Sequence, residues 1–163
     1  MRKLRKLDLA ELAKVMLVIP ESELSSIVGA YDNDCFWRCV AYYLNNGIAS
    51  ESAAGQYALN YFSGSGCDHA CLSANGAGMD FQDARAYVQA NLPRARILYL
   101  NPDNISWYRN NGYSSLGGNS HAVIYQCATP DGQHQVYDPA NDVTFTINAY
   151  EASTANGTYK TWS

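Results

Sequence analysis

Three side chains have the types and the order that nucleophilic thiol chemistry requires: Cys35, His121 and Asp138. A cysteine thiolate can attack a carbonyl carbon, an imidazole can take up and return the proton, and a carboxylate can hold the imidazole in one tautomer. Together they predict amide cleavage through a covalent intermediate. The alternatives are His69 and His134 as weaker bases, and Asn141 and Asp142 in place of the carboxylate.

Each of the three residues, taken alone, also fits an ordinary structural role. Cys35 lies among apolar residues, where cysteine is commonly a small core side chain. His121 can be a hydrogen-bonded histidine at a strand end, and Asp138 before Pro139 can open a turn. The order of the three, rather than any one of them, carries the catalytic hypothesis.

The predicted local structure explains how these residues meet. Cys35 lies in the first turn of a predicted helix, where free backbone N–H groups and the helix dipole favour a thiolate. His121 begins a predicted strand after the glycine-rich segment 112–120, and Asp138 ends the next strand. Thr129-Pro130-Asp131-Gly132 between them is a strong hairpin motif. Because a hairpin brings strand ends together, we expect His121 and Asp138 to be neighbours.

The order of the predicted elements indicates an α+β fold. Apolar residues at helical spacing predict helices in the first half, and short β-prone runs follow. Helices that precede antiparallel strands are typical of α+β proteins. Residues 63–78, rich in glycine and serine, are predicted to form a loop. The predicted helices are residues 35–46, 51–62 and 81–91, and the predicted strands are residues 96–100, 121–127, 135–137 and 143–147.

Four short motifs follow one another: Asp34-Cys35, Gly78 before the third helix, His121-Ala122-Val123-Ile124 and Tyr137-Asp138-Pro139-Ala140. In this order they resemble the papain-like cysteine peptidases, most closely the C39-like (bacteriocin-processing) group. The resemblance covers residues 32 to about 147, and residues 32–38 also look like the nucleophile segment of OTU-type deubiquitinating peptidases. It implies a papain-like α+β fold, a Cys-His-Asp triad acting on a peptide or protein substrate, and neither metal nor cofactor.

The oxyanion site departs from this resemblance. Papain-like peptidases place a glutamine six residues before the cysteine, and that position is Gly29 here. Losing such a donor is expected to lower the rate about a hundredfold. The remaining candidates are Asp32, Asn33 and the backbone N–H of Cys35, and Asn33 alone offers a neutral side-chain donor.

The first 30 residues differ in charge from the rest of the chain. They hold five basic and four acidic residues, whereas the remainder holds six basic and eleven acidic ones. Apolar residues at spacings near three and four predict an amphipathic helix that ends at Pro20. Asp8, Glu11 and Lys14 interrupt the apolar run that a secretory signal needs. We therefore place a boundary after residue 30, with one peptidase-like domain over residues 31–163.

Four spaced apolar residues precede a pair of small residues, Gly29-Ala30. This pattern resembles the double-glycine leaders of exported bacterial peptides. It implies that residues 1–30 are removed by a leader-recognising ABC transporter or peptidase, and that a protein made in the bacterial cytoplasm becomes secreted or cell-surface. The alternative is an ordinary N-terminal helix with Gly29 as its C-cap. The four apolar residues are Met16, Ile19, Leu24 and Ile27.

Length and composition limit the other possibilities. With 163 residues, 47% hydrophobic and 16% charged, the chain is predicted to fold as one compact domain. No apolar stretch approaches the roughly 20 residues of a membrane-spanning helix. A net charge of -4 argues against a nucleic-acid partner. Two other function classes stay open: a secreted, ribosomally made antimicrobial or signalling protein with a catalytically inactive papain-like domain, and a disulfide- or metal-stabilised structural module.

The other four cysteines need a separate account. An even set fits two disulfides in an exported protein, and one bridge would join Cys39 to the Cys67–Cys71 loop. Simply reduced thiols are the alternative. A zinc site of Cys39, Cys67, His69 and Cys71 is weaker than either, because Cys-x-His-x-Cys lacks the usual Cys-x2-Cys spacing. The four are Cys39, Cys67, Cys71 and Cys127.

Leader removal is directly measurable. When the chain is produced with its export system, we expect the intact mass of the released protein to lack residues 1–30, so that Tyr31 is the new N-terminus. Replacing Gly29 with a bulky residue should block this cut, because a narrow peptidase cleft admits only small side chains there. A released protein that keeps Met1 would contradict the leader interpretation.

Overall fold

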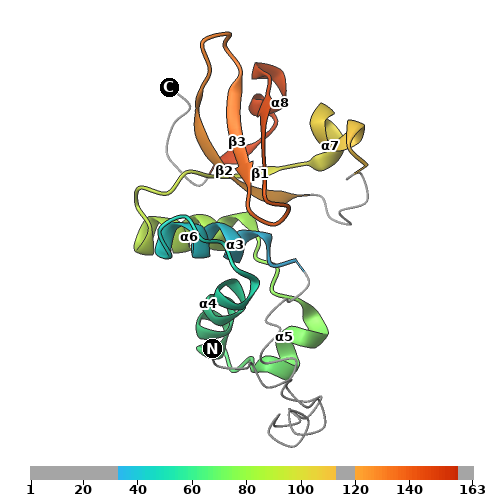
Figure 1. Cartoon of the computed structure of the whole chain (residues 1–163). Coiled ribbons are helices and arrows are strands. Elements are labelled where there is room, and N and C mark those ends of the chain that lie inside the picture. Colours follow the sequence, from blue (N-terminus) through green and yellow to red (C-terminus); the bar gives the residue numbers. More distant parts are fainter. Residues whose placement is uncertain (1–32, 113–119, 158–163) are drawn as a thin grey trace, which may run out of the picture.

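The computed structural model describes residues 33–112 and 120–157, in which helices precede an antiparallel sheet (Figure 1). This order confirms the predicted α+β class. The predicted N-terminal helix, the cleavage pair Gly29-Ala30 and Asp32 lie outside the described residues. The helices before the sheet are α3 (Cys35–Leu44), α4 (Glu51–Ser63), α5 (His69–Asn75) and α6 (Phe81–Asn91). The strands are β1 (Ile97–Leu100), β2 (His121–Ala128), β3 (His134–Asp138), β4 (Val143–Ile147) and β5 (Asn156–Gly157).

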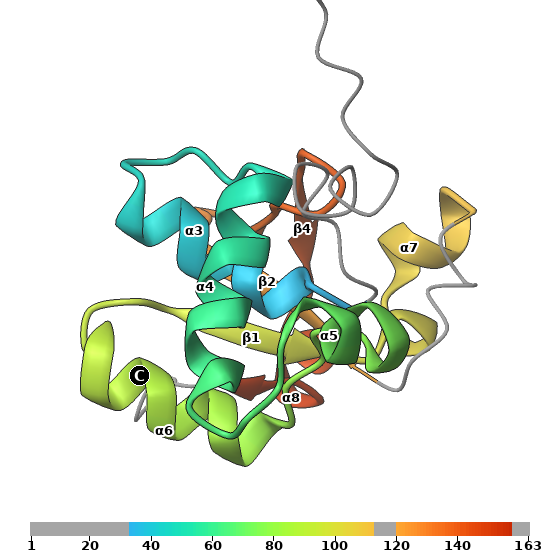
Figure 2. The same ribbon diagram turned by 90° about the horizontal axis from the view of Figure 1, so that it is seen from below.

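The sheet is covered on both faces because successive residues of a strand point to opposite sides. Its order is β4-β3-β2-β1-β5, and every neighbouring pair is antiparallel. Ile97 and Tyr99 of β1 join the core that contains α3, α4 and α6, which lie on one side of the sheet (Figures 1 and 2). Leu98 and Leu100 join a second core, which includes residues of the short helices α7 (Ser106–Asn110) and α8 (Ala149–Ser153).

Helix α3 is deeply buried because apolar side chains occupy most of its surface. Phe36, Trp37 and Val40 are at most 1% exposed. The Trp37 indole N–H also finds a partner, the carbonyl oxygen of Ala77 at 2.9 Å. The helix ends at Leu44, two residues before the predicted end, because the chain turns through left-handed backbone at residues 46 and 47, with φ of 53° and 93°.

The hairpin between β2 and β3 forms where the sequence predicts it. The Thr129 N–H donates to the Gln133 carbonyl at 2.8 Å, and Gly132 adopts φ of 79°, a left-handed conformation that glycine adopts without strain. The strands then run back so that Ile124 faces Tyr137 across the ladder. As a result, the start of β2 and the end of β3 lie side by side.

The predicted loop over residues 63–78 is wrong in its middle, which forms α5. The side chain of Asp68 accepts a hydrogen bond from the Cys71 N–H and caps this helix, and Gly76 with φ of 76° follows its last residue. Because glycine and serine lie on both sides of His69–Asn75, the sequence pattern predicts a loop there. The segment nevertheless forms a helix, since Asp68 caps its start.

The two predicted disulfides are also wrong, because a single bridge joins Cys67 to Cys71, with their Cα atoms 5.4 Å apart. Cys39 is fully buried within α3 and stays a free thiol, and Cys127 is free and exposed on β2. The bridge excludes the alternative zinc site as well, since sulfurs bonded to each other are not thiolate ligands.

No helix in the described part of the chain is long and apolar enough to cross a membrane.

Thiol counting tests the cysteine assignment. Denatured, unreduced protein should take up three iodoacetamide groups, on Cys35, Cys39 and Cys127, whereas reduction first should raise the number to five. The Cys67→Ser variant is the control, because freeing Cys71 adds one adduct without reduction. A single adduct on the unreduced wild type would contradict the structure and restore the two-disulfide alternative.

Candidate active site

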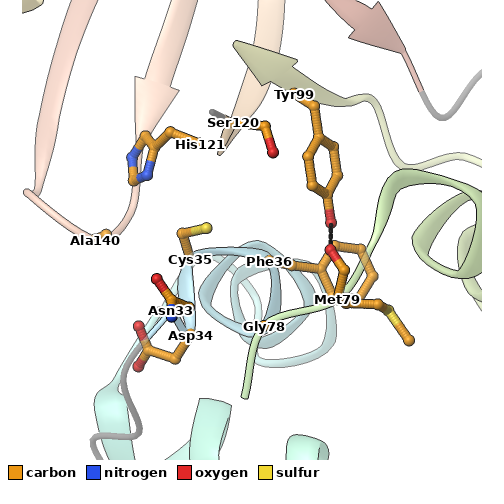
Figure 3. Close-up of a pocket in the computed structure, with 10 residues that line it drawn as sticks. All are labelled: Asn33, Asp34, Cys35, Phe36, Gly78, Met79, Tyr99, Ser120, His121 and Ala140. Atoms are coloured by element: carbon orange, nitrogen blue, oxygen red, sulfur yellow. Dashed lines mark hydrogen bonds between the residues drawn. The ribbon is translucent and has the colours of Figure 1, made fainter. Parts of the chain in front are cut away.

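The start of α3, the start of β2 and the end of β3 bring Cys35, His121 and Asp138 together. Cys35 is the first residue of α3, and its Sγ accepts a hydrogen bond from the Ala122 N–H at 3.4 Å. His121 is the first residue of β2 and is 6% exposed. Asp138 is the last residue of β3 and is fully buried. Figure 3 shows the Cys35 sulfur and the His121 ring on facing sides of a pocket.

The imidazole of His121 has a defined orientation. Its Nε2 lies 2.9 Å from Oδ2 of Asp138, which confirms that the two residues are neighbours. A buried carboxylate accepts hydrogen bonds, so Nε2 carries a proton, and Nδ1 is the nitrogen left to serve the thiol. Burial alone would lower the pKa of His121. The hydrogen bond to Asp138, the negative charge of Asp138 and the proximity of Cys35 together outweigh burial and raise this pKa to about 10.

The Asp138 carboxylate is buried without losing its charge because five hydrogen bonds converge on it. Oδ2 accepts from Nε2 of His121 at 2.9 Å, from the Tyr108 hydroxyl at 2.7 Å and from Nδ2 of Asn141 at 2.7 Å. Oδ1 accepts from the backbone N–H groups of Ala140 at 3.0 Å and Asn141 at 3.4 Å. Burial favours the neutral acid, but the bonds from His121, Asn141 and Tyr108 keep the pKa of Asp138 below its usual value.

Asp34, the residue before Cys35, does not cap the start of α3 with its side chain. Among the described residues, the Asp34 carboxylate makes no capping bond to α3 and instead accepts from Nε of Arg38 at 3.1 Å. Arg38 in turn pairs with Glu51 of α4. The first N–H groups of a helix have no partner within it. They are therefore available to an oxygen bound beside Cys35.

A cleft of about 410 Å³ opens in front of Cys35 and His121. Two aromatic side chains hold the backbone of one wall. The Tyr99 hydroxyl donates to the Met79 carbonyl at 3.3 Å, drawn in Figure 3, and Trp37 holds Ala77 from the core. Asn33, which adopts a left-handed φ of 62°, lies beside Cys35 at the cleft (Figure 3). The lining consists of residues 33–36, Gly78, Met79, Tyr99, Ser120, His121 and Ala140.

The weaker sequence candidates take other positions. Asn141 donates to Asp138 and so supports the carboxylate that it could have replaced, while Asp142 accepts from the Tyr137 hydroxyl at 2.8 Å. Neither His69 nor His134 is among the described residues that line the cleft. His69 begins α5, and His134 lies at the hairpin end of β3.

Asn33 is the one side-chain oxyanion candidate that the structure describes at the cleft. The other two positions, Asp32 and Gly29, lie outside the described residues.

Tyr108 is a member of the site that sequence reasoning missed. It lies 30 positions before Asp138, in the short helix α7, which the sequence pattern does not predict. A buried tyrosine hydroxyl needs a partner, but neither spacing nor motif indicates which one.

Among residues 33–112 and 120–157, no cluster of three or more His, Cys, Asp or Glu side chains is arranged to hold a metal ion. A scan of the chain against protein-family models found no match, and searches of curated proteins and of solved structures found none either. The function is therefore inferred from the geometry and chemistry of the site around Cys35, His121 and Asp138.

The charge on His121 can be tested by titration. In ¹⁵N NMR spectra, His121 should stay an imidazolium at pH 8 and lose its proton near pH 10. Since this pKa lies above the ordinary 6.5, the charged ring stabilises the fold fully below pH 6.5, and its contribution is lost as the pH rises through about 10.

Two variants complete this test. In Asp138→Asn the midpoint should fall well below that of the wild type, because the hydrogen bond and charge of the carboxylate are lost while burial remains. Asp142→Asn, which removes a nearby carboxylate bound to Tyr137, should leave the midpoint unchanged. A wild-type midpoint near 6.5 would show that the pair does not form.

Proposed function

We propose that this protein is a papain-like cysteine peptidase, or a related enzyme that cleaves amide bonds, most similar to the C39-like group. The observation that carries the proposal is that Cys35 and His121 line one cleft, while Nε2 of His121 lies 2.9 Å from Oδ2 of Asp138 and the Cys35 sulfur accepts a hydrogen bond from the N–H of the next residue, Ala122. Three residues from three separate elements converge there in the roles that acyl transfer to a thiol needs.

In the first half of the reaction, the Cys35 sulfur adds to the carbonyl carbon of the substrate, and the carbonyl oxygen becomes an oxyanion. Collapse of this intermediate breaks the C–N bond, and the His121 imidazolium donates its proton to the departing amine. The product is a thioester on Cys35. Asp138 keeps Nε2 protonated throughout, so Nδ1 is the atom that exchanges protons with the reactants.

In the second half, neutral His121 takes a proton from water, whose oxygen attacks the thioester carbon. The C–S bond breaks, the acid leaves, and the thiolate and imidazolium are restored. Each proton taken by the imidazole is returned, so the cycle is hydrolysis and needs no further reactant.

The oxyanion has two sources of stabilisation in this proposal. One is the backbone N–H of Cys35 at the uncapped start of α3, where the helix dipole also favours negative charge. The other is the Asn33 amide, which lines the cleft and would supply the side-chain donor that a glutamine supplies in papain-like peptidases. Asp34 does not repel the oxyanion strongly, because its charge is paired with Arg38.

The route of the protein is also a proposal. Residues 1–30 serve as a double-glycine-type leader, recognised by an ABC transporter or peptidase, and the domain over residues 31–163 acts outside the cell or on its surface. A peptide or protein fits as substrate, because the cleft is lined by both polar residues, such as Asn33 and Ser120, and apolar ones, such as Phe36 and Met79.

Selective labelling of Cys35, together with an assay of peptide cleavage, tests the proposal. Brief iodoacetamide treatment of the folded, full-length and leader-free chains at mildly acidic pH should modify Cys35 first, although Cys127 is the more exposed free thiol. Cleavage of a mixed peptide library, followed by mass spectrometry, should fall at least about a thousandfold in Cys35→Ala.

Cys127→Ala is the matched control and should retain both labelling at Cys35 and cleavage. If an unoxidised Cys35 reacts no faster than Cys127, and no peptide is cut, the enzyme proposal is wrong. A secreted antimicrobial or signalling domain without turnover would then be the better account.

A further inference from the structure

The Asp138 carboxylate is tied to a distant part of the chain by one side chain. Four of its five hydrogen bonds come from His121 or from the turn that follows Asp138 itself. The fifth comes from Tyr108 in α7, whose hydroxyl lies 2.7 Å from Oδ2. This oxygen is also the one that accepts from Nε2 of His121. The tyrosine therefore acts on the atom that orients the imidazole.

Tyr108 itself is held rigidly. It is fully buried, and its ring meets Phe145 edge-on at 5.0 Å between centroids. Its ring also stands perpendicular to the His121 ring, with the centroids 5.7 Å apart. Tyr108 thus touches both members of the pair, Asp138 through its hydroxyl and His121 through its ring.

The helix that carries Tyr108 is anchored at its start. The Ser106 N–H, in the first turn of α7, donates to Oε1 of Glu151 at 2.6 Å. Glu151 is buried and belongs to a capping box with Asn148 at the start of α8. Because α7 has only five residues, this external bond helps to hold a helix too short to be stable alone.

We propose that Tyr108 is a positioning residue for the His121–Asp138 pair. Its hydroxyl keeps Oδ2 aligned with Nε2, and the edge of its ring limits tilting of the imidazole. The catalytic consequence rests on the proposed function, whereas the hydrogen bond and its effect on Asp138 can be measured without turnover.

The charges around Asp138 support this role. The hydrogen bond from Tyr108 favours the carboxylate over the neutral acid, and burial together with the Asp138 charge keeps the pKa of Tyr108 above its ordinary value. The tyrosine is therefore a donor at every pH at which the protein would work. The titratable groups that surround Asp138 are His121 from β2, Tyr108 from α7, Cys39 from α3 and Tyr137 from its own strand.

The experiment compares two tyrosine-to-phenylalanine variants of the full-length chain. Tyr108→Phe keeps the ring and removes the hydroxyl, and Tyr137→Phe removes a tyrosine–aspartate bond on the same sheet, to Asp142. With ¹³C-labelled aspartate, the midpoint of Asp138 protonation should rise by about one pH unit in Tyr108→Phe. It should not move in Tyr137→Phe. If cleavage is present, kcat should fall roughly tenfold in Tyr108→Phe with little change in KM.

A second measurement covers the case in which Tyr108→Phe does not fold. In the wild type at neutral pH, the Tyr108 hydroxyl proton should exchange slowly with water and show a nuclear Overhauser effect to the His121 ring. Absence of this proton signal, or an unchanged Asp138 midpoint in a folded Tyr108→Phe, would overturn the inference. If the Asp138 midpoint rises in Tyr108→Phe but the wild type cuts no peptide, the proposed function is wrong and the role of Tyr108 stands.

Discussion

Burial of α3 against the first residues of β2 is the constraint on which the rest of the site depends. Phe36 and Val40 can leave water only if the helix lies against the sheet, and full burial of such side chains is worth about 1.5–3 kcal/mol each. The same packing brings the Cys35 sulfur to 3.4 Å from the Ala122 N–H. Cys35 is therefore positioned by the apolar face of its own helix, and changes in that core alter the candidate site directly.

The packing also decides where buried charge can be tolerated. An isolated carboxylate in the core is strongly unfavourable, and Asp138 escapes this cost because five donors reach its two oxygens. The imidazole gains in turn, because the pKa of His121 rises against the effect of burial. The positive charge of His121 and the negative charge of Asp138 therefore stabilise each other. The donors come from β2, from α7 and from the turn after β3, so the pair stays intact only while these three segments keep their positions.

The charge of a second carboxylate, that of Asp34, is paired by similar means. Asp34 stands where a helix-capping residue is expected, yet its side chain pairs with Arg38. Burial raises the pKa of Asp34 and the Arg38 charge opposes this effect, so the carboxylate, although it lines the cleft, has its charge paired with Arg38. The N–H groups at the start of α3 are thereby left without a bond from the Asp34 side chain. Glu51, which completes the ion pair, lies in the first turn of α4, where an acidic side chain suits the helix dipole.

The sequence by itself determined the features that depend on local pattern. Apolar spacing located α3, α4 and α6, the Thr129–Gly132 turn located the hairpin, and the hairpin implied that His121 meets Asp138. The sequence did not predict α5, because this helix lies in a glycine-rich stretch and depends on a cap from Asp68. It did not predict the disulfide either, because pairing depends on distances in space that the spacing of cysteines along the chain does not give. Only the tertiary structure decided that Tyr108 supports Asp138 and that Asp34 turns to Arg38. Such partners come from segments whose proximity results from burying the core, and burial is a property of the whole fold rather than of any local run of residues.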